Sequence, residues 1–264
     1  MQILNIIIDI FVFLFGVCVG SFLNCVIYRL EEKKSLSGRS FCPHCKHTLS
    51  WLDLFPVFSF VFLGGKCRYC RKKISIQYPL VELSVGILFV LIFWEVWLPS
   101  AGIFGLVSLC FMFYIAASMA IMFIYDLKHY IIPDKILFPA IAITVIYNLI
   151  PPYNTQHIFY NFLGAVVASG FFLTIFLVSR GKWMGFGDVK LAILMGLLLG
   201  LANVLVALFL AFFFGAIIGV ILMFFQKKDI KSEIPFGPFL IIGTFIAMFY
   251  GTQLVQWYIN FFQI

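Results

Sequence analysis

Two aspartates stand at the borders of long apolar segments in this chain. Asp126 ends one such segment, and Asp188 begins another, inside the sequence MGFGDVK at 184–190. A carboxylate held away from water is costly, so an acid at the edge of a membrane is a candidate for function. Two such acids suit acid–base chemistry, in which one carboxylate accepts a proton and the other donates one.

Four cysteines form a second group whose spacing suits chemistry. They occur as two CxxC pairs, Cys42/Cys45 and Cys67/Cys70, with 21 residues between the pairs. Four thiolates at such spacing can surround one Zn²⁺ tetrahedrally and close its coordination, as in structural zinc sites. A redox pair and unligated thiols are the alternatives, and His44 and His47 would be spare ligands. The pattern favours structural zinc.

Several residues beside the aspartates could support them. Gly185 and Gly187 allow a tight turn and a close approach to a ligand. Lys190 could steady an ionised Asp188 or contact an acidic substrate residue, and it could equally be a basic side chain that snorkels to the interface. Asp188 itself could simply cap a helix N-terminus, where the helix dipole favours an anion.

Two further acids have open roles. Asp134 follows Pro133, a combination typical of a helix start, and a direct catalytic role is the less favoured alternative. Glu82 falls about one turn inside the second apolar segment, where it is either a buried polar contact or part of a substrate site.

The elements that must position these residues are membrane helices. The chain is 63% hydrophobic and only 11% charged, which predicts an all-α polytopic membrane protein. Eight spans are expected, at 4–28, 78–98, 103–126, 135–150, 159–179, 188–201, 203–225 and 238–261. The chain divides into a first transmembrane helix (1–28), a zinc-binding loop (29–77) and a seven-helix membrane core (78–264).

The basic residues predict the orientation. With eight spans, all 18 Lys and Arg fall on one side of the membrane, and the connections near 99–102, 151–158 and 202–203 carry none. Because Lys and Arg favour the cytoplasm, the zinc loop and both aspartates should lie at the cytoplasmic face, with both termini outside.

The loop 29–77 has ten basic and three acidic side chains, a net charge of +7. Attraction to anionic lipid explains this charge more simply than nucleic-acid binding, so no nucleic-acid partner is expected. The apolar segment 51–63 inside the loop is too short to span a bilayer. It is expected to pack on the membrane surface or under the zinc loop.

Five motifs together resemble the type IV prepilin peptidases, the leader peptidases of pilins and pseudopilins. They are GSFLN through YRL at 20–30, the two CxxC pairs, YPLVE at 78–82, Asp126 with IPD at 132–134, and GFGDVK at 185–190. The GxGD element alone is shared with presenilin-like proteases, whereas the five together cover nearly the whole chain and are highly specific.

The resemblance implies a membrane aspartic protease with Asp126 and Asp188 as its catalytic pair. Such an enzyme would remove the short basic leader of a prepilin at the cytoplasmic face of the bacterial inner membrane. Many members with the cysteine loop also methylate the new N-terminus with S-adenosylmethionine. No nucleotide-binding motif is present, so the sequence assigns no residue to this cofactor.

The same residues would also suit two other classes of function. A proton-coupled transporter could use the two aspartates as a relay, but it would more naturally hold acids near mid-membrane and show repeated halves. A methyltransferase or zinc-organised binding protein with an idle protease site is the other class, and the intact pair of aspartate motifs argues against it. The sequence leaves the oligomeric state and the particular prepilin open.

Overall fold

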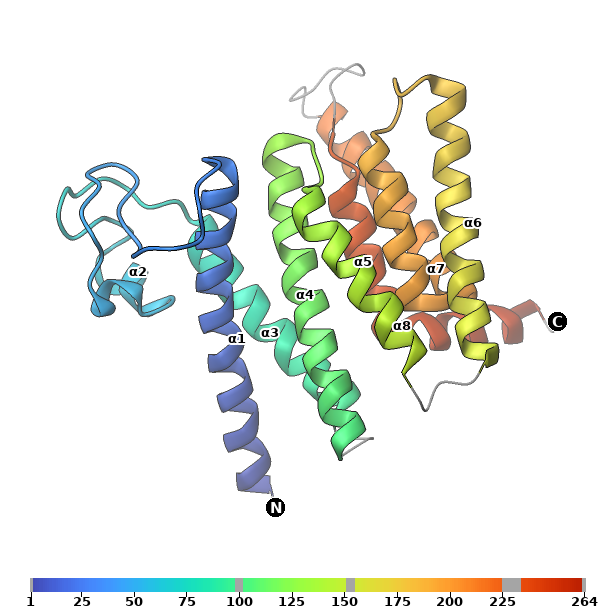
Figure 1. Cartoon of the computed structure of the whole chain (residues 1–264), viewed down its shortest axis with the longest axis horizontal. Coiled ribbons are helices and arrows are strands. Elements are labelled where there is room, and N and C mark those ends of the chain that lie inside the picture. The colour runs from blue at the N-terminus through green and yellow to red at the C-terminus, as the bar shows by residue number, and fades with distance from the viewer. Residues whose placement is uncertain (1, 98–101, 151–154, 225–233, 263–264) are drawn as a thin grey trace. The chain divides into compact units, whose positions relative to one another are not determined.

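The chain is helical over most of its described length, and the main exception is the loop between residues 32 and 76 (Figure 1). The computed structural model describes residues 2–97, 102–150, 155–224 and 234–262. Within these ranges the only β structure is two isolated bridges, Phe41–Thr48 and Lys66–Lys73. The helices are α1 (Gln2–Glu31), the 3₁₀ helix η1 (Trp51–Leu54), α2 (Phe58–Phe62), α3 (Gln77–Val96), α4 (Ile103–His129), α5 (Asp134–Leu149), α6 (Thr155–Ser179), α7 (Phe186–Phe224) and α8 (Gly237–Phe262).

Six helices, α1, α3, α4, α6, α7 and α8, are long and apolar enough to cross a membrane. The 16 residues of α5 make a shorter segment, and α7 consists of two helices that meet at a kink. Counted with α5 and the two halves of α7, the helices match the eight expected segments. The all-α polytopic architecture predicted from the apolar runs is therefore confirmed.

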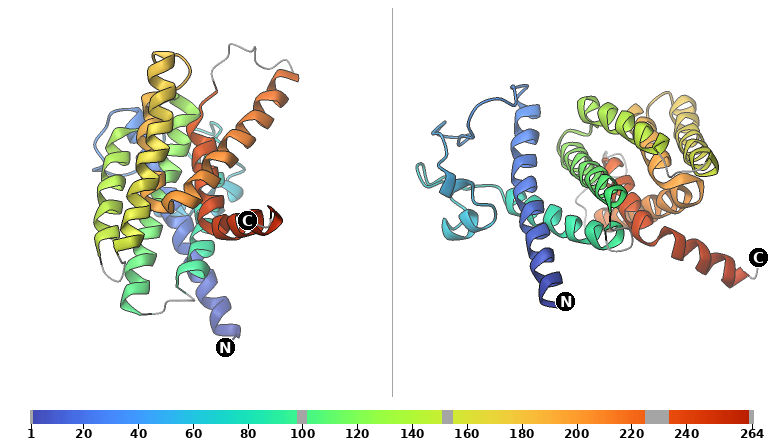
Figure 2. Two further views of the ribbon diagram at one scale, coloured as in Figure 1. Left: turned by 90° about the vertical axis from the view of Figure 1, so that its right-hand side faces the viewer. Right: turned by 60° about the horizontal axis from the view of Figure 1, so that its bottom comes forward.

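The kink in α7 lies at Gly200, where φ is 71° and ψ is 176°. Glycine adopts this left-handed conformation without a Cβ penalty. The side chain of Asn148 donates a 2.9 Å hydrogen bond to the Leu197 carbonyl just before the kink, where a helix break leaves carbonyls without intrahelical partners. The sequence had predicted a connection at 202–203, but the two halves meet two residues earlier with no loop between them, and the chain bends sharply there (Figure 2).

The chain divides into two compact units, residues 1–121 and 122–264. In the first unit, α1 and α3 cross closely because both carry glycine at the crossing. A Cβ built on Gly16 would come within 2.8 Å of the Gly86 Cα, so no larger residue fits there. The Phe89 and Phe113 rings stack 4.0 Å apart in the same unit and join α3 to the first part of α4.

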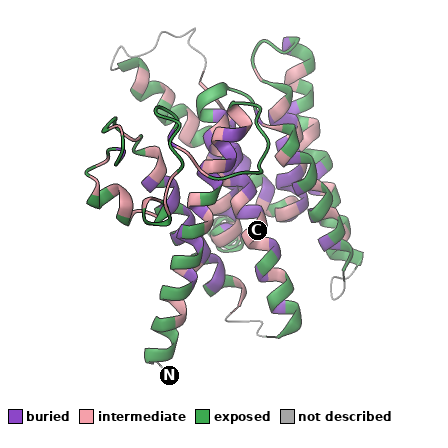
Figure 3. Cartoon of the chain, turned by 60° about the vertical axis from the view of Figure 1, so that its left-hand side comes forward, coloured by how far each residue is buried: buried purple, intermediate pink, exposed green. Residues whose placement is uncertain are grey.

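The loop between α1 and α3 is mostly exposed (Figure 3). Its start is tied to the end of α1 by the buried Arg29 guanidinium. Arg29 donates hydrogen bonds to the carbonyls of Ser35, Ser37, Gly38 and Arg39, over 2.8 to 3.4 Å. These acceptors satisfy a charged group that would otherwise be costly to bury.

In the second unit, α5, α6 and α8 pack against α7. The backbones of α6 and α7 nearly touch, since a Cβ on Gly196 would fall 2.2 Å from the Ala165 nitrogen. Leu191, Leu194 and Met195 of α7 are fully buried. The start of α7, which carries Asp188, is thereby fixed within this unit.

Candidate active site

Asp126 lies in the last turn of α4 and is only 5% exposed. Its carbonyl accepts the Tyr130 N–H at 2.9 Å, and α4 ends at His129, three residues beyond the predicted end of this span. The carboxylate is thus carried by a rigid helical turn.

Asp188 is the third residue of α7 and is 8% exposed. Its backbone N–H donates to the Gly185 carbonyl at 3.2 Å, which closes the turn that starts the helix. Position 187 has little room, because a Cβ built there would lie 3.3 Å from the Ile132 Cβ. Glycine at position 187 therefore lets the start of α7 lie close against Ile132.

The structure brings the two aspartates together although 61 residues separate them in sequence. Asp126 Oδ2 and Ile132 Cδ1 both lie within 3.4 Å of a Cβ built on Gly237, and Ile132 also lies against Gly187, the residue before Asp188. The end of α4 and the start of α7 thus meet at one place in the second unit. Two adjacent carboxylates with this burial are a suitable acid–base pair.

The Oδ2 atom of Asp126 is buried and has no hydrogen-bond partner among the described residues. Buried polar atoms are nearly always satisfied, so an unsatisfied carboxylate oxygen calls for an explanation. The lack of a partner is explained if Asp126 Oδ2 holds a proton or binds a water molecule, and both are roles that suit an acid–base pair.

Gly237, at the start of α8, is a site residue that the sequence analysis missed. Its backbone faces the Asp126 carboxylate, and a Cβ built on it would lie 2.5 Å from Asp126 Oδ2 and 3.4 Å from Ile132 Cδ1. The available signal was the sequence PFGP at 235–238, in which a glycine followed by proline opens a predicted helix on the side of the aspartates.

Lys190 pairs with Asp134 through an ion pair between its Nζ atom and Asp134 Oδ1. The ammonium group also lies 5.4 Å from the ring of Phe138 and 5.6 Å from that of Phe186. Asp134 is the first residue of α5, as a helix-start residue should be. The pair therefore ties the start of α5 to the first turns of α7, next to Asp188.

Glu82 makes its contacts within the first unit. It is 6% exposed, and its Oε2 atom accepts the Val57 N–H at 2.7 Å. The backbone of α1 also lies against this residue, since a Cβ built on Gly20 would lie 2.7 Å from the Glu82 Cα. Glu82 thus acts as a buried polar contact that joins α1 and α3 to the segment between the cysteine pairs.

The four cysteines converge on a candidate metal centre. All four Sγ atoms lie within 4.8 Å of one another, and those of Cys42 and Cys70 are 3.9 Å apart. Tetrahedral zinc with Zn–S bonds near 2.3 Å requires sulfur–sulfur separations of about 3.8 Å. The chemistry and the spacing of the donors therefore fit a zinc ion.

The two CxxC pairs have the same backbone conformation. In each, the residue after the second cysteine has a positive φ, 60° at Lys46 and 59° at Arg71, and its N–H donates to the carbonyl of the first cysteine, Cys42 or Cys67. The His47 and Tyr69 rings stack 3.7 Å apart and connect the two turns. Neither His44 nor His47 belongs to the cluster of ligands.

The clustered thiols have divergent acidities. Burial opposes ionisation of Cys42, but hydrogen bonds from Cys45, His44 and Cys67 outweigh it and lower the pKa of this thiol from 9.0 to about 7. At Cys70 a hydrogen bond from Lys72 favours the thiolate, yet burial and the neighbouring thiols raise the pKa to about 11. A first thiolate thus makes the next harder to form, and a bound cation would remove that penalty.

Comparisons with known proteins identify two family domains in the chain. The family described as the bacterial peptidase A24 N-terminal domain matches residues 14–96, and the type IV leader peptidase family matches residues 113–220. The first contains both CxxC pairs and Glu82, and the second contains Asp126 and Asp188.

Curated relatives match along nearly the full chain. The prepilin leader peptidase/N-methyltransferase of Legionella pneumophila is 32% identical over 94% of this chain and 93% of its own length. The proteins of the same description from Aeromonas hydrophila and Vibrio cholerae are 30% and 32% identical, over 95% and 90% of this chain and 93% and 94% of their own lengths. No solved structure matches the chain.

Proposed function

The chain belongs to the type IV leader peptidase family, and on that premise we propose that it is a membrane aspartic endopeptidase that removes the leader of type IV prepilins or pseudopilins. The observation that carries the proposal is the pairing of buried Asp126 and Asp188, with one Asp126 oxygen free of any hydrogen bond among the described residues. Family membership supports this reading and not the proton-coupled transporter.

The proposed mechanism uses the two carboxyl groups in opposite states. The ionised aspartate takes a proton from water, and the water oxygen attacks the scissile carbonyl carbon. The protonated aspartate donates its proton to the carbonyl oxygen. The tetrahedral intermediate then collapses with cleavage of the C–N bond. The proton taken from water passes to the leaving amine, and one hydroxyl proton of the intermediate returns to the aspartate that had protonated the carbonyl oxygen, which restores the pair. One shared proton suffices because two adjacent carboxylates do not both ionise cheaply.

The surrounding residues have positioning roles in this proposal. Gly185 and Gly187 shape the turn before Asp188, and Gly237 leaves room for the Asp126 carboxylate. The Lys190–Asp134 ion pair holds α5 against α7. We assign no part in the bond-breaking step to the three glycines, to Lys190 or to Asp134.

We propose that the site lies at the cytoplasmic face of the inner membrane. Every Lys and Arg falls on that side in the eight-segment topology, which puts both termini outside. Lys227, Lys228 and Lys231, which contribute to this argument, lie outside the described residues. A site at this border could reach the junction between a cytoplasmic leader and a membrane-embedded pilin helix while still admitting water.

A second activity, N-methylation of the new pilin N-terminus with S-adenosylmethionine, is proposed from the double description of the relatives. We also propose that Cys42, Cys45, Cys67 and Cys70 hold one structural Zn²⁺. Bound there, zinc would order a loop that has little apolar core of its own. The loop then serves as a folded cytoplasmic module between α1 and α3.

The test is co-expression with a candidate prepilin, followed by mass measurement of the product N-terminus. Wild type should shorten the prepilin by its leader, and a methylated product would be heavier by one methyl group. Asp126→Asn and Asp188→Asn should each abolish cleavage while the protein still inserts in the membrane. Asp134→Asn is the matched control and should retain substantial cleavage. Normal processing by either of the first two variants would remove that residue from the catalytic role.

A further inference from the structure

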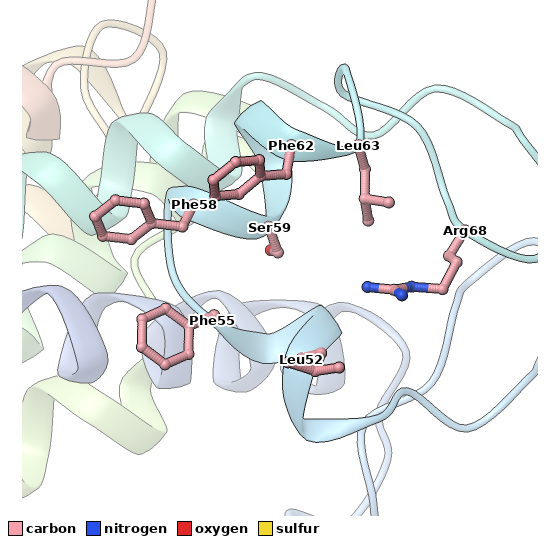
Figure 4. Close-up of a pocket in the computed structure, with 7 residues that line it drawn as sticks. All are labelled: Leu52, Phe55, Phe58, Ser59, Phe62, Leu63 and Arg68. Carbon is pink, nitrogen blue, oxygen red and sulfur yellow. The ribbon is translucent and has the colours of Figure 1, made fainter.

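A pocket lies between η1 and α2, inside the loop that carries the cysteines (Figure 4). Its volume is about 360 Å³, and its wall is almost entirely apolar. The apolar side chains are Leu52, Phe55, Phe58, Phe62 and Leu63, and Arg68 provides the one charge. Neither the cysteine cluster nor the aspartate pair includes any of these side chains.

The surface around this pocket is strongly apolar and exposed. Phe62 is 85% exposed, Trp51 71%, and Phe55 and Phe58 each 53%. A loop surrounded by water would not normally expose so many aromatic side chains. Contiguous exposed apolar patches mark contacts with a partner or a membrane. Large aromatic rings with a nearby cation are typical of the membrane interface.

A hydrogen bond from the backbone ties this surface to the first turns of an apolar helix that is long enough to cross a membrane. Val57, just before α2, donates its N–H to Glu82, the sixth residue of the membrane-spanning helix α3. The turn is strained, since Val57 has φ 59° and ψ −52° while Phe58 N–H bonds to the Pro56 carbonyl. The Glu82 contact fixes this turn, and α2 lies alongside α1 rather than beyond its end (Figures 1 and 2).

Arg68 is oriented by Asp53, whose two carboxylate oxygens both accept hydrogen bonds. Its Nε donates to Asp53 Oδ1 at 2.7 Å, while Asp53 Oδ2 accepts hydrogen bonds from Ser50 and Tyr69. The guanidinium group points toward the apolar side chains of the pocket (Figure 4). Its remaining N–H groups can bind a second anion, and the excess of basic side chains in the loop favours such an anion.

We propose that this pocket is a binding site for an anionic phospholipid of the leaflet that the loop faces. An acyl chain would pack among Phe55, Phe58 and Phe62, and the lipid phosphate would contact the free N–H groups of Arg68. Both halves of the pocket are then used. Ile76, just before α3, and Leu80, in its first turn, are 66% and 57% exposed and would add apolar surface for the same lipids. The site is independent of the proteolytic step.

The test measures quenching of Trp51 by brominated acyl chains, with the full-length protein in lipid nanodiscs. Trp51 is made the sole tryptophan by replacing Trp94, Trp97, Trp183 and Trp257 with Phe. Brominated phosphatidylglycerol and brominated phosphatidylcholine, with the same chains, are compared at equal mole fraction. Both lipids should quench the fluorescence of Trp51. Phosphatidylglycerol should reach half-maximal quenching at a mole fraction at least about fivefold lower than phosphatidylcholine, which is the effect of one basic side chain at a membrane surface.

Arg68→Gln in this background should lower the preference for phosphatidylglycerol by about fivefold, to the level that the other basic side chains of the loop give, while leaving the quenching by phosphatidylcholine. Arg68→Lys should retain part of the preference, and Lys73→Gln, which removes an exposed charge from the same loop, should retain all of it. Unchanged zinc content in each variant shows that the loop is folded. If neither lipid quenched Trp51 fluorescence, the placement of this surface in the bilayer would be overturned. Equal quenching by both lipids in the unsubstituted loop would overturn the anionic site.

Discussion

Replacing Gly237 with alanine separates catalysis from folding. The new Cβ would lie 2.5 Å from Asp126 Oδ2, and real Cβ atoms do not approach closer than 3.0 Å, so the carboxylate must move by at least the difference, about 0.5 Å. The atom that must yield is the end of a side chain rather than backbone. The fold should therefore accommodate Gly237→Ala, while the geometry of the aspartate pair changes.

The expected loss of activity is large. A displacement approaching 1 Å of a reacting group can cost roughly 100-fold in rate, so prepilin cleavage by Gly237→Ala should fall by about one to two orders of magnitude. The initial rate of cleavage of a purified prepilin in detergent measures this loss, and thermal unfolding of the same sample measures stability. The unfolding midpoint should move by only a few degrees.

Two further glycine variants calibrate the result. A Cβ on Gly170 of α6 would meet nothing within 4 Å, so Gly170→Ala should keep full activity. Gly196→Ala would drive a Cβ to 2.2 Å from the Ala165 backbone, so it should lose stability and activity together. Wild-type cleavage by Gly237→Ala would refute the placement of Gly237 against Asp126. Inactivity accompanied by unfolding would mean that Gly237 serves packing instead.

Other predictions follow from the loop and the topology. Replacing Cys67 and Cys70 with serine should remove zinc, lower cleavage less than the aspartate variants do, and lower methylation more, as metal analysis and product mass would show. Zinc content well below one per chain in wild type prepared without chelator would contradict the site. Because protons compete with the metal for the thiolates, zinc affinity in a competition titration should weaken as pH falls, and more steeply below about 7, where the Cys42 thiol is also protonated. A reporter cysteine at Leu36 should react only from the cytoplasmic side and one at Thr155 only from outside, and labelling of Leu36 from outside would invert the topology.

The sequence by itself determined the elements and the chemical groups of this protein. Long apolar runs predict helices because a chain in lipid must satisfy its backbone hydrogen bonds internally, and these runs located the helices to within a few residues. The CxxC spacing predicted a four-sulfur cluster because each pair forms within one local turn. The two aspartates stood out because unneutralised acids are rare in such apolar surroundings.

Only the tertiary structure decided which distant residues meet. The position of Gly200 between two apolar runs does not reveal a kink without a loop, since that kink depends on the amide of Asn148 from another helix. Lys190 pairs with Asp134 and not with Asp188, which is only two residues away in the sequence, and this pairing likewise depends on how α5 packs against α7. Gly237 was missed because a glycine carries no chemical group, and its role arises from the space that the Asp126 carboxylate occupies beside it. Local patterns encode local structure, whereas these contacts join segments whose separation in the chain is closed only by packing.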